Sequence, residues 1–313
     1  MKNDNISIII PFLNEEDNIP DLVKYLDENC KQAPFKAEII FVDDGSKDKS
    51  TQILKQQKFE NFDAKIITLS KNYGSHNAIR AGILNATNDI CTFFSADLQE
   101  PFSIITKMYE KIQSGSQIVC GYKERVKIGK IEKFFSNAYS KLIRRYAVKD
   151  FPIEGVNTIM FNGQVKENLN SNIEKNSSIM LQIIDMGYKK EFIPYSLNER
   201  KKGKSKWTFA KRIKLFIDSF VNFSYVPIRV VSILGILMSI ISVIIAIIMV
   251  IYKLFINNQM PIGYPTLLVV ILLGFGTTNI SLGIVAEYMW RILDTTRNRP
   301  VFLVDKIEEI RKE

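Results

Sequence analysis

Apolar and polar positions alternate along the first 225 residues in a way that predicts strands separated by helices. Short runs rich in Ile, Val and Phe are followed by longer amphipathic stretches, a pattern typical of a mainly parallel sheet with crossover helices. The predicted strands span residues 6–12, 37–42, 66–69 and 90–94, and the predicted helices span 18–30, 46–57 and 76–85. We therefore expect an α/β domain over residues 1–225.

Two long uncharged stretches follow this domain. Residues 230–252 provide 23 positions without a charge, and residues 265–286 provide another 22. Each exceeds the length of about 20 helical residues that a bilayer core requires. They predict two transmembrane helices within residues 226–290, followed by a tail at 291–313. Two buried helices of a soluble core are the alternative.

The formal charge of +9 is concentrated beside these stretches. Ten Lys or Arg stand between Tyr188 and Lys214 against two Glu, whereas residues 253–264 carry one Lys. The positive-inside rule then places the N-terminal domain and both termini on the cytoplasmic face of a plasma membrane crossed twice. A basic belt in this place favours contact with membrane lipids over nucleic acid.

A few residue types limit the remaining possibilities. Three cysteines without a CxxC pair and a single histidine indicate neither a disulfide framework nor a zinc site. Gly274, Gly276 and Gly283 in the second stretch would allow close helix packing, either within one chain or in a homo-oligomer.

Polar clusters follow three of the predicted strands directly. They are residues 14–16, residues 43–46 and residues 95–100. In sheets of this kind, ligands bind beyond the carboxyl ends of the strands. The sequence therefore predicts a binding site built by these three loops.

Five motifs in this order resemble the family-2 glycosyltransferases of the polyprenyl-phosphate type, which include dolichol-phosphate mannosyltransferases and bactoprenol glucosyltransferases. The motifs are SIIIPFLNEEDNI, FVDDGSKDKS, KNYGSHNAIRAGI, FFSADLQEP and ERKKGKSKW, and they span about Ser7 to Arg291. The resemblance implies a GT-A fold, an inverting mechanism and a divalent metal that holds the donor pyrophosphate.

The resemblance also implies which residues bind the nucleotide-sugar: Pro11, Glu15, Asp43, Asp44, Ser95, Asp97 and Gln99. Carboxylates can accept hydrogen bonds from ring N–H groups and ribose hydroxyls. We expect one member of the Asp43–Asp44 pair to bind the nucleotide and the other to brace the turn.

Asp97 is the predicted metal ligand, with Gln99 beside it, for Mg²⁺ or Mn²⁺. Such a cation would act as a Lewis acid on the departing pyrophosphate. Most relatives have Asp-x-Asp where this chain has Ser95-Ala96-Asp97, so one carboxylate is missing. We expect weaker metal binding or an altered donor contact at Ser95.

The acceptor side is predicted from basic residues near the membrane. An anionic polyprenyl phosphate requires basic hydrogen-bond donors close to the bilayer. The candidates are Lys123, Arg125, Arg200, Lys204 and Ser205, with Arg200 also proposed as catalytic beside Asp97. Residues 131–146 have the amphipathic pattern of a helix lying on a bilayer.

The predicted reaction is a direct displacement by an acceptor phosphate oxygen. A phosphate is already anionic near neutral pH, so no strong general base is demanded. Many bactoprenol-type relatives carry Gly-Asp-Phe-Arg where this chain reads Gly155-Val156-Asn157-Thr158, so any role of those side chains does not transfer.

The sequence thus predicts a metal-dependent hexosyltransferase that moves one sugar from a UDP- or GDP-sugar to undecaprenyl phosphate. Transfer to another lipid acceptor and an inactive membrane scaffold are the alternatives. A processive polysaccharide synthase is disfavoured, because two spans make a poor channel and no Q-x-x-R-W run is present.

Overall fold

The computed structural model describes most of the chain and divides it into two compact units. The described residues are 5–124, 141, 144–145, 151–152, 155–174, 178–196, 226–255, 263–297 and 299–310. The first unit comprises Met1–Asn222 together with Pro300–Glu313, and the second comprises Phe223–Arg299. Both ends of the sequence therefore belong to the first unit.

The first half of the sheet follows the predicted alternation of strands and helices. The elements are β1 (Asn5–Phe12), α1 (Ile19–Cys30), β2 (Lys36–Asp43), α2 (Ser50–Lys55), β3 (Asp63–Leu69), α3 (Ser75–Leu84) and β4 (Ile90–Phe93). Every strand and helix predicted here is present. Two elements differ clearly in extent. β3 begins three residues earlier than predicted, and α2 begins four residues later, because residues 46–49 bond to the loop after β1 instead.

The second half of the unit adds strands that the sequence did not predict. It contains α4 (Ser103–Gln113), β5 (Ile118–Lys123), β6 (Thr158–Phe161), α6 (Gly163–Ser171), α7 (Ile179–Asp185), β7 (Lys190–Tyr195) and β8 (Val304–Ile310). The sheet has eight strands in the order β7-β5-β6-β4-β1-β2-β3-β8. Only β6 and β8 run antiparallel to their neighbours. The GT-A-like α/β class is therefore confirmed, as a mixed sheet.

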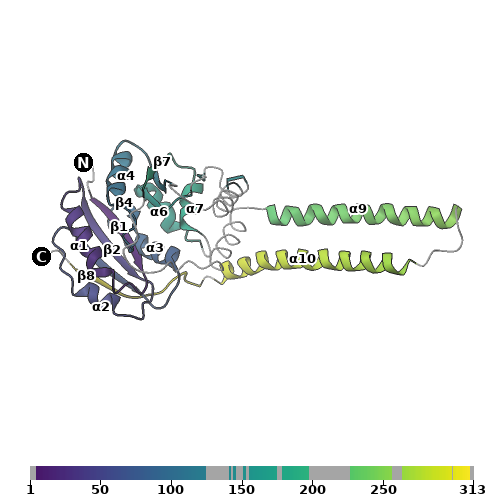
Figure 1. The fold of residues 1–313 in the computed structure, drawn as a ribbon, viewed down its shortest axis with the longest axis horizontal. Helices are drawn as coiled ribbons and strands as arrows, with labels where there is room; N and C mark the ends of the chain where they lie inside the picture. Colours follow the sequence, from purple (N-terminus) through teal and green to yellow (C-terminus); the bar gives the residue numbers. More distant parts are fainter. Residues whose placement is uncertain are drawn as a thin grey trace. The chain divides into compact units, whose positions relative to one another are not determined.

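The central strands are apolar on both faces because helices cover both (Figure 1). Ile8 and Ile10 belong to the core cluster that includes residues of α1 and α4. The intervening Ile9 faces α3, where Gly82 leaves no room for a side chain between helix and strand. This two-sided burial explains why β1 is a nearly continuous apolar run and not an alternating one.

The C-terminal strand β8 closes one edge of the sheet. It pairs antiparallel with β3, and Lys65 of β3 lies 3.5 Å from Glu309 and 3.2 Å from Glu38 of β2. The residues predicted as a tail thus include an edge strand. Because an uncovered edge exposes unpaired backbone groups, β8 protects β3 from pairing with another chain.

The second unit contains two long helices, α9 (Val226–Phe255) and α10 (Tyr264–Thr296), joined in the order predicted for a hairpin. Within the parts of the chain described here, no helix meets the combined length and hydropathy of a membrane span. The helices are therefore present, but their prediction as membrane spans is not confirmed.

Candidate active site

Three loops meet at the carboxyl ends of the central strands, because β4, β1 and β2 are parallel neighbours. Phe12 at the end of β1 pairs with Asp43 at the end of β2, and Asp44 N–H donates to the Phe12 carbonyl at 2.9 Å. Phe94 N–H, just after β4, donates to the carbonyl of Ile9 at 2.8 Å. The loops 13–18, 43–49 and 94–102 therefore begin side by side.

The half-buried Pro11 occupies a position in β1 where a missing N–H is tolerated. Pairing of β1 with β4 ends at Ile9, so beyond that point β1 has a neighbour on one side only, β2. Proline lacks the amide donor of a ladder and is confined to such places. The end of β1 is thus unpaired on the side of the loop that follows β4.

Reciprocal hydrogen bonds join the loop after β1 to the loop after β2. Asn14 N–H donates to Ser46 Oγ at 2.9 Å, and Lys47 N–H donates back to Asn14 Oδ1 at 2.8 Å. Glu15 N–H donates to Ser50 Oγ at 2.7 Å, while the Glu15 carboxylate accepts from Asn18 Nδ2 at 2.6 Å. Glu15 therefore stabilises its own loop in addition to any contact with a ligand.

Both carboxylates of the Asp43–Asp44 pair brace loops. Asp43 accepts from Ser46 N–H at 2.7 Å and from the hydroxyl of Thr51. Asp44 accepts from the N–H groups of Tyr73 and Gly74, at 2.7 and 2.9 Å. The sequence predicted that only one of the two would brace a turn. Each carboxylate oxygen has two lone pairs, so a nucleotide contact would be made in addition to these bonds.

The buried position of Asp44 affects its protonation. Burial raises the pKa of this carboxyl above its usual value and the charge of Asp43 adds to the effect, while the two backbone donors oppose it. Gly45 next to it has φ of 75°, and a Cβ there would lie 2.6 Å from the Lys71 carbonyl carbon. The turn therefore fits against the backbone after β3 only with glycine at this position.

The loop after β4 orients the predicted metal ligand. Asp97 Oδ1 accepts from Ser95 Oγ at 2.8 Å and from Gln99 N–H at 3.2 Å. Leu98 between them has φ of 57°, a left-handed conformation that is uncommon for leucine. Ser95, which replaces an expected carboxylate, thus contributes by holding Asp97.

One pair of residues at this site was missed by the sequence reasoning. Glu100 is 6% exposed, and Tyr195 at the end of β7 donates its hydroxyl proton to Glu100 Oε1 at 3.0 Å. Burial, with a contribution from the charge of Asp97, raises the pKa of Glu100 to about 7. Burial and the nearby Glu100 raise the pKa of Tyr195 as well. Glu100 ends the predicted polar cluster, but no local pattern points to a partner 95 residues away.

The loop after β3 leads into a buried polar cluster on α3. His76 Nδ1 is buried without a hydrogen-bond partner among the described residues, and burial together with Arg80 lowers the pKa of His76 to about 4. Arg80, one turn further along, donates to Gln182 Oε1 of α7 at 2.6 Å. His76 is thus neutral near pH 7.

The predicted acceptor residues are only partly within the described ranges. Lys123 ends β5 and is paired in register with Tyr195 on β7. The next residue, Glu124, donates its N–H to the Tyr195 carbonyl at 2.8 Å. Arg125, Arg200, Lys204 and Ser205, and almost all of residues 131–146, lie outside the described residues. The structure therefore places one acceptor candidate on the strand beside the Glu100–Tyr195 pair.

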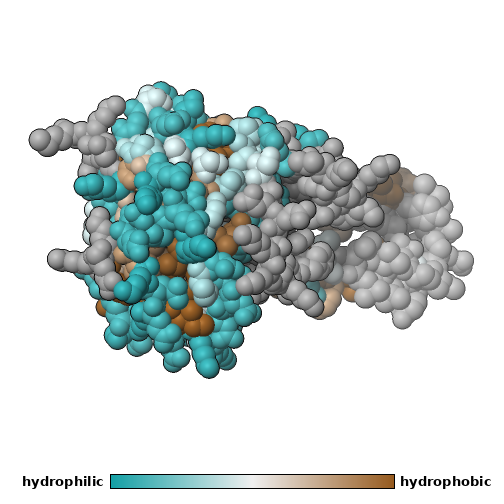
Figure 2. Space-filling view, turned by 60° about the vertical axis from the view of Figure 1, so that its left-hand side comes forward, coloured by the Kyte–Doolittle hydropathy of each residue, from teal (hydrophilic) through white to brown (hydrophobic). Residues whose placement is uncertain are grey.

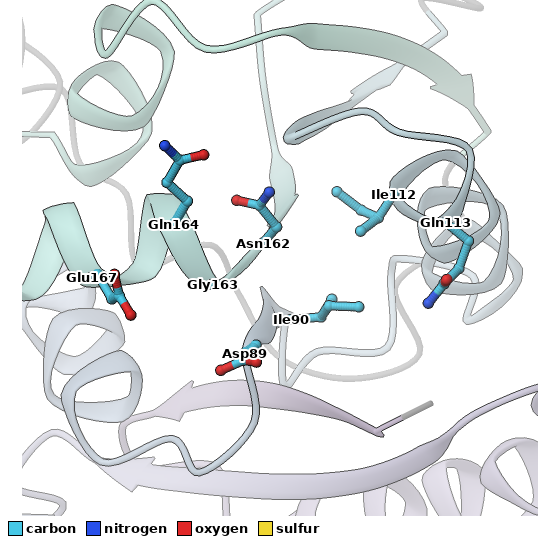
Figure 3. Close-up of a pocket in the computed structure, with 8 residues that line it drawn as sticks. All are labelled: Asp89, Ile90, Ile112, Gln113, Asn162, Gly163, Gln164 and Glu167. Atoms are coloured by element: carbon cyan, nitrogen blue, oxygen red, sulfur yellow. The ribbon is translucent and has the colours of Figure 1, made fainter. Parts of the chain in front are cut away.

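Two further observations concern ligands. No group of three or more His, Cys, Asp or Glu suited to a metal occurs among the residues that the structure describes. A pocket of ≈ 460 Å³ lies between the start of β4, the end of α4 and the start of α6 (Figure 3). Because Asp89 and Ile90 at its wall precede β4, the pocket is at the opposite end of that strand from Asp97 and contains none of the predicted site residues.

Comparison with known proteins agrees with this arrangement of loops. The model of the family described as "Glycosyl transferase family 2" matches residues 7–169, which include most of β1, all of β2 and β4, and all three loops. The chain belongs to glycosyltransferase family 2. Membership confirms the resemblance on which the site residues were chosen, and the role of each residue stays a prediction.

Relatives of this family-2 chain match it over nearly its whole length. The glycosyltransferase YkcC of Bacillus subtilis is 33% identical over 304 residues, covering 96% of this chain and 93% of the relative. A prophage-derived bactoprenol glucosyl transferase of Shigella flexneri is 28% identical, with 96% and 97% covered. An undecaprenyl-phosphate 4-deoxy-4-formamido-L-arabinose transferase of Klebsiella pneumoniae is 27% identical, with 96% and 93% covered.

Proposed function

We propose that this family-2 glycosyltransferase moves one sugar from a UDP- or GDP-sugar to a polyprenyl phosphate such as undecaprenyl phosphate. The observation that carries the proposal is the length of the match to two relatives whose names specify this lipid. Both align with 96% of the chain, so the similarity includes the helices α9 and α10 as well as the catalytic unit.

The loops after β1, β2 and β4 would form the donor site. Asp43 and Asp44, which brace the turn after β2 and the loop after β3, would contact the nucleotide. Asp97 would face its pyrophosphate. Carboxylate and amide oxygens suit Mg²⁺ or Mn²⁺, which take only a few protein ligands when phosphates supply the others. Asp97 and Gln99 would hold this ion, which supplies positive charge to the leaving diphosphate. Because only one carboxylate is present, we expect the affinity of the site for the metal ion to depend on the bound nucleotide.

The transfer would proceed by inversion. An oxygen of the acceptor phosphate attacks the anomeric carbon, the bond from that carbon to the diphosphate oxygen breaks, and the nucleoside diphosphate leaves with the bonding electrons. Lys123 would attract the acceptor phosphate from the end of β5, together with the basic residues Arg125, Arg200 and Lys204, and the Ser205 hydroxyl would donate a hydrogen bond to it. The phosphate is already anionic, so no buried base is required.

The second unit would anchor the enzyme to the cytoplasmic face of the plasma membrane. Of the exposed large apolar side chains in the described residues, 23 lie on α9 and α10 and six on the first unit. On the face of the first unit shown in Figure 2, by contrast, hydrophilic side chains cover most of the described surface, and hydrophobic ones form separate patches. Exposed apolar side chains in this number on two helices favour contact with lipid or another apolar partner. The uncharged runs at 230–252 and 265–286 support a membrane role.

A transfer assay tests the proposal. Membranes containing the full chain are incubated with radiolabelled UDP- and GDP-sugars, undecaprenyl phosphate, and either Mn²⁺ or EDTA. We expect one donor to give a mild-acid-labile lipid product. Asp97→Ala should lower the rate by more than about 100-fold, because even residues that only support a metal ligand contribute about 10- to 100-fold.

Asp63→Ala is the matched control. Asp63 is an exposed carboxylate at the start of β3, at the opposite end of the strands from the loops. If nucleotide binds but no donor yields a polyprenyl product, the acceptor is another lipid. If titration calorimetry detects neither nucleotide nor metal binding, the chain is an inactive scaffold and the proposal is wrong.

A further inference from the structure

The loop that carries Asp97 is closed by a second carboxylate, that of Glu100. Glu100 accepts a hydrogen bond from Ser95 N–H at the start of the loop and another from the Tyr195 hydroxyl, at 3.0 Å. Ser95 in turn donates its hydroxyl proton to Asp97 Oδ1. A continuous chain of hydrogen bonds therefore runs from Tyr195 through Glu100 and Ser95 to Asp97.

The backbone of this loop needs such a closure. Leu98 has φ of 57°, in a region where a side chain is disfavoured. A conformation of this kind persists only where surrounding contacts over-determine it. The bonds of Glu100 to both Ser95 and Tyr195 supply contacts of this type, since they fix the start and the end of the loop together.

The partner of Glu100 belongs to the acceptor side of the site. Tyr195 is the last residue of β7, and the chain continues from it toward Arg200, Lys204 and Ser205. It is also in register with Lys123 on β5. The Glu100–Tyr195 bond thus joins the predicted metal loop to the two strands that lead into the predicted acceptor residues.

Simple packing does not account for this pair. Glu100 is 6% exposed and Tyr195 is equally buried. Burying a carboxylate is unfavourable unless it is hydrogen-bonded, and apolar side chains of similar size would fill the same space without that cost. A buried carboxylate here is useful if its hydrogen bonds hold neighbouring groups in one geometry.

We infer that Glu100 is a positioning residue, which holds Asp97 for the divalent cation and, through Tyr195, keeps the donor loop in register with the acceptor strands. This inference rests on the proposed function. It requires no direct contact of Glu100 with substrate.

The test measures the Mn²⁺ requirement of the full-length chain in two ways: the dissociation constant of Mn²⁺ in the presence of nucleotide, by electron paramagnetic resonance, and the Mn²⁺ concentration that gives half-maximal sugar transfer. Glu100→Ala should raise it about 10- to 100-fold, as supporting residues of metal ligands do. Tyr195→Phe should raise it roughly 2- to 10-fold, the value of one hydrogen bond, and saturating Mn²⁺ should restore its rate. Glu100→Gln should recover most of the loss, because an amide oxygen still accepts from Ser95 and a tyrosine hydroxyl can either donate or accept.

Two variants at the other end of β7 serve as controls. Glu191 accepts from Ser116 Oγ, and the Tyr188 hydroxyl is hydrogen-bonded to Asn168. Glu191→Ala and Tyr188→Phe remove comparable bonds far from the loop, so they should leave the Mn²⁺ requirement unchanged even if they lower the melting temperature.

The outcomes separate the inference from the function. If the wild type transfers sugar and the Glu100 and Tyr195 variants change only stability, as the controls do, the pair is structural and the inference is wrong. An unchanged Mn²⁺ requirement with a lower rate at saturation also contradicts it. If the wild type transfers no sugar from any donor, the proposed function fails and the inference fails with it.

Discussion

Protonation of His76 should destabilise the folded chain. The ring nitrogen Nδ1 is buried without a partner among the described residues, and burial with the charge of Arg80 lowers the pKa from 6.5 to about 4. Between these two pH values the unfolded state binds a proton that the folded state does not bind. The stability due to the neutral ring is complete above pH 6.5 and decreases as the pH falls toward about 4.

The size of this effect follows from the two pKa values. A pKa that changes from 6.5 to about 4 on folding corresponds to about 3 kcal/mol of unfolding free energy, since each unit of pKa difference is worth roughly 1.4 kcal/mol. Replacing His76 by Gln removes the titrating group. The variant should therefore lose about 3 kcal/mol less than the wild type when the pH is lowered through this window.

The chain has a single histidine, which makes the assay direct. Its ¹³C-labelled ring gives one resonance to follow against pH in the full-length protein, and chemical denaturation of the wild type and His76→Gln at each pH gives the stability difference. A ring midpoint at or above about 6, close to that of an exposed histidine, would refute the reasoning. Parallel stability profiles for the two proteins would refute it equally.

Two further substitutions probe the turn after β2 and the packing at the opposite end of the strands. Gly45→Ala should cost more than about 2 kcal/mol and raise the KM for the nucleotide-sugar, because φ is 75° and the new Cβ would lie 2.6 Å from the Lys71 carbonyl carbon. Gly115→Ala is its control, with φ of 103° but nothing within 4 Å; equal losses in denaturation would contradict the steric argument. Lys65→Met should cost about 3–5 kcal/mol in the same assay, because it removes a buried cation and leaves the Glu38 carboxylate, 3.2 Å away and only 11% exposed, without it. Lys111→Met breaks an exposed pair with Glu191, which solvent screens, and should cost much less. A similar loss in both lysine variants would show that the Lys65 pair is no more important.

The loops of the site could be predicted because their positions follow from local rules. Residues 14–16, 43–46 and 95–100 come directly after apolar runs, and parallel neighbouring strands bring such loops to one edge. Side-chain partners were not predictable in the same way. Asp43 and Asp44 both brace backbone, and for Asp44 the donors are Tyr73 and Gly74, about 30 residues further along the chain.

The sequence by itself determined the alternation of strands and helices, the polar loops after them and the family, because each depends on neighbouring residues or on motif order. Only the tertiary structure determined that β6 enters the sheet antiparallel between β4 and β5 and that β8 returns to cover β3. It also determined that Glu100 meets Tyr195. Strand order and register depend on which arrangement buries the core and pairs the backbone of the whole chain, and a local pattern carries no information about either.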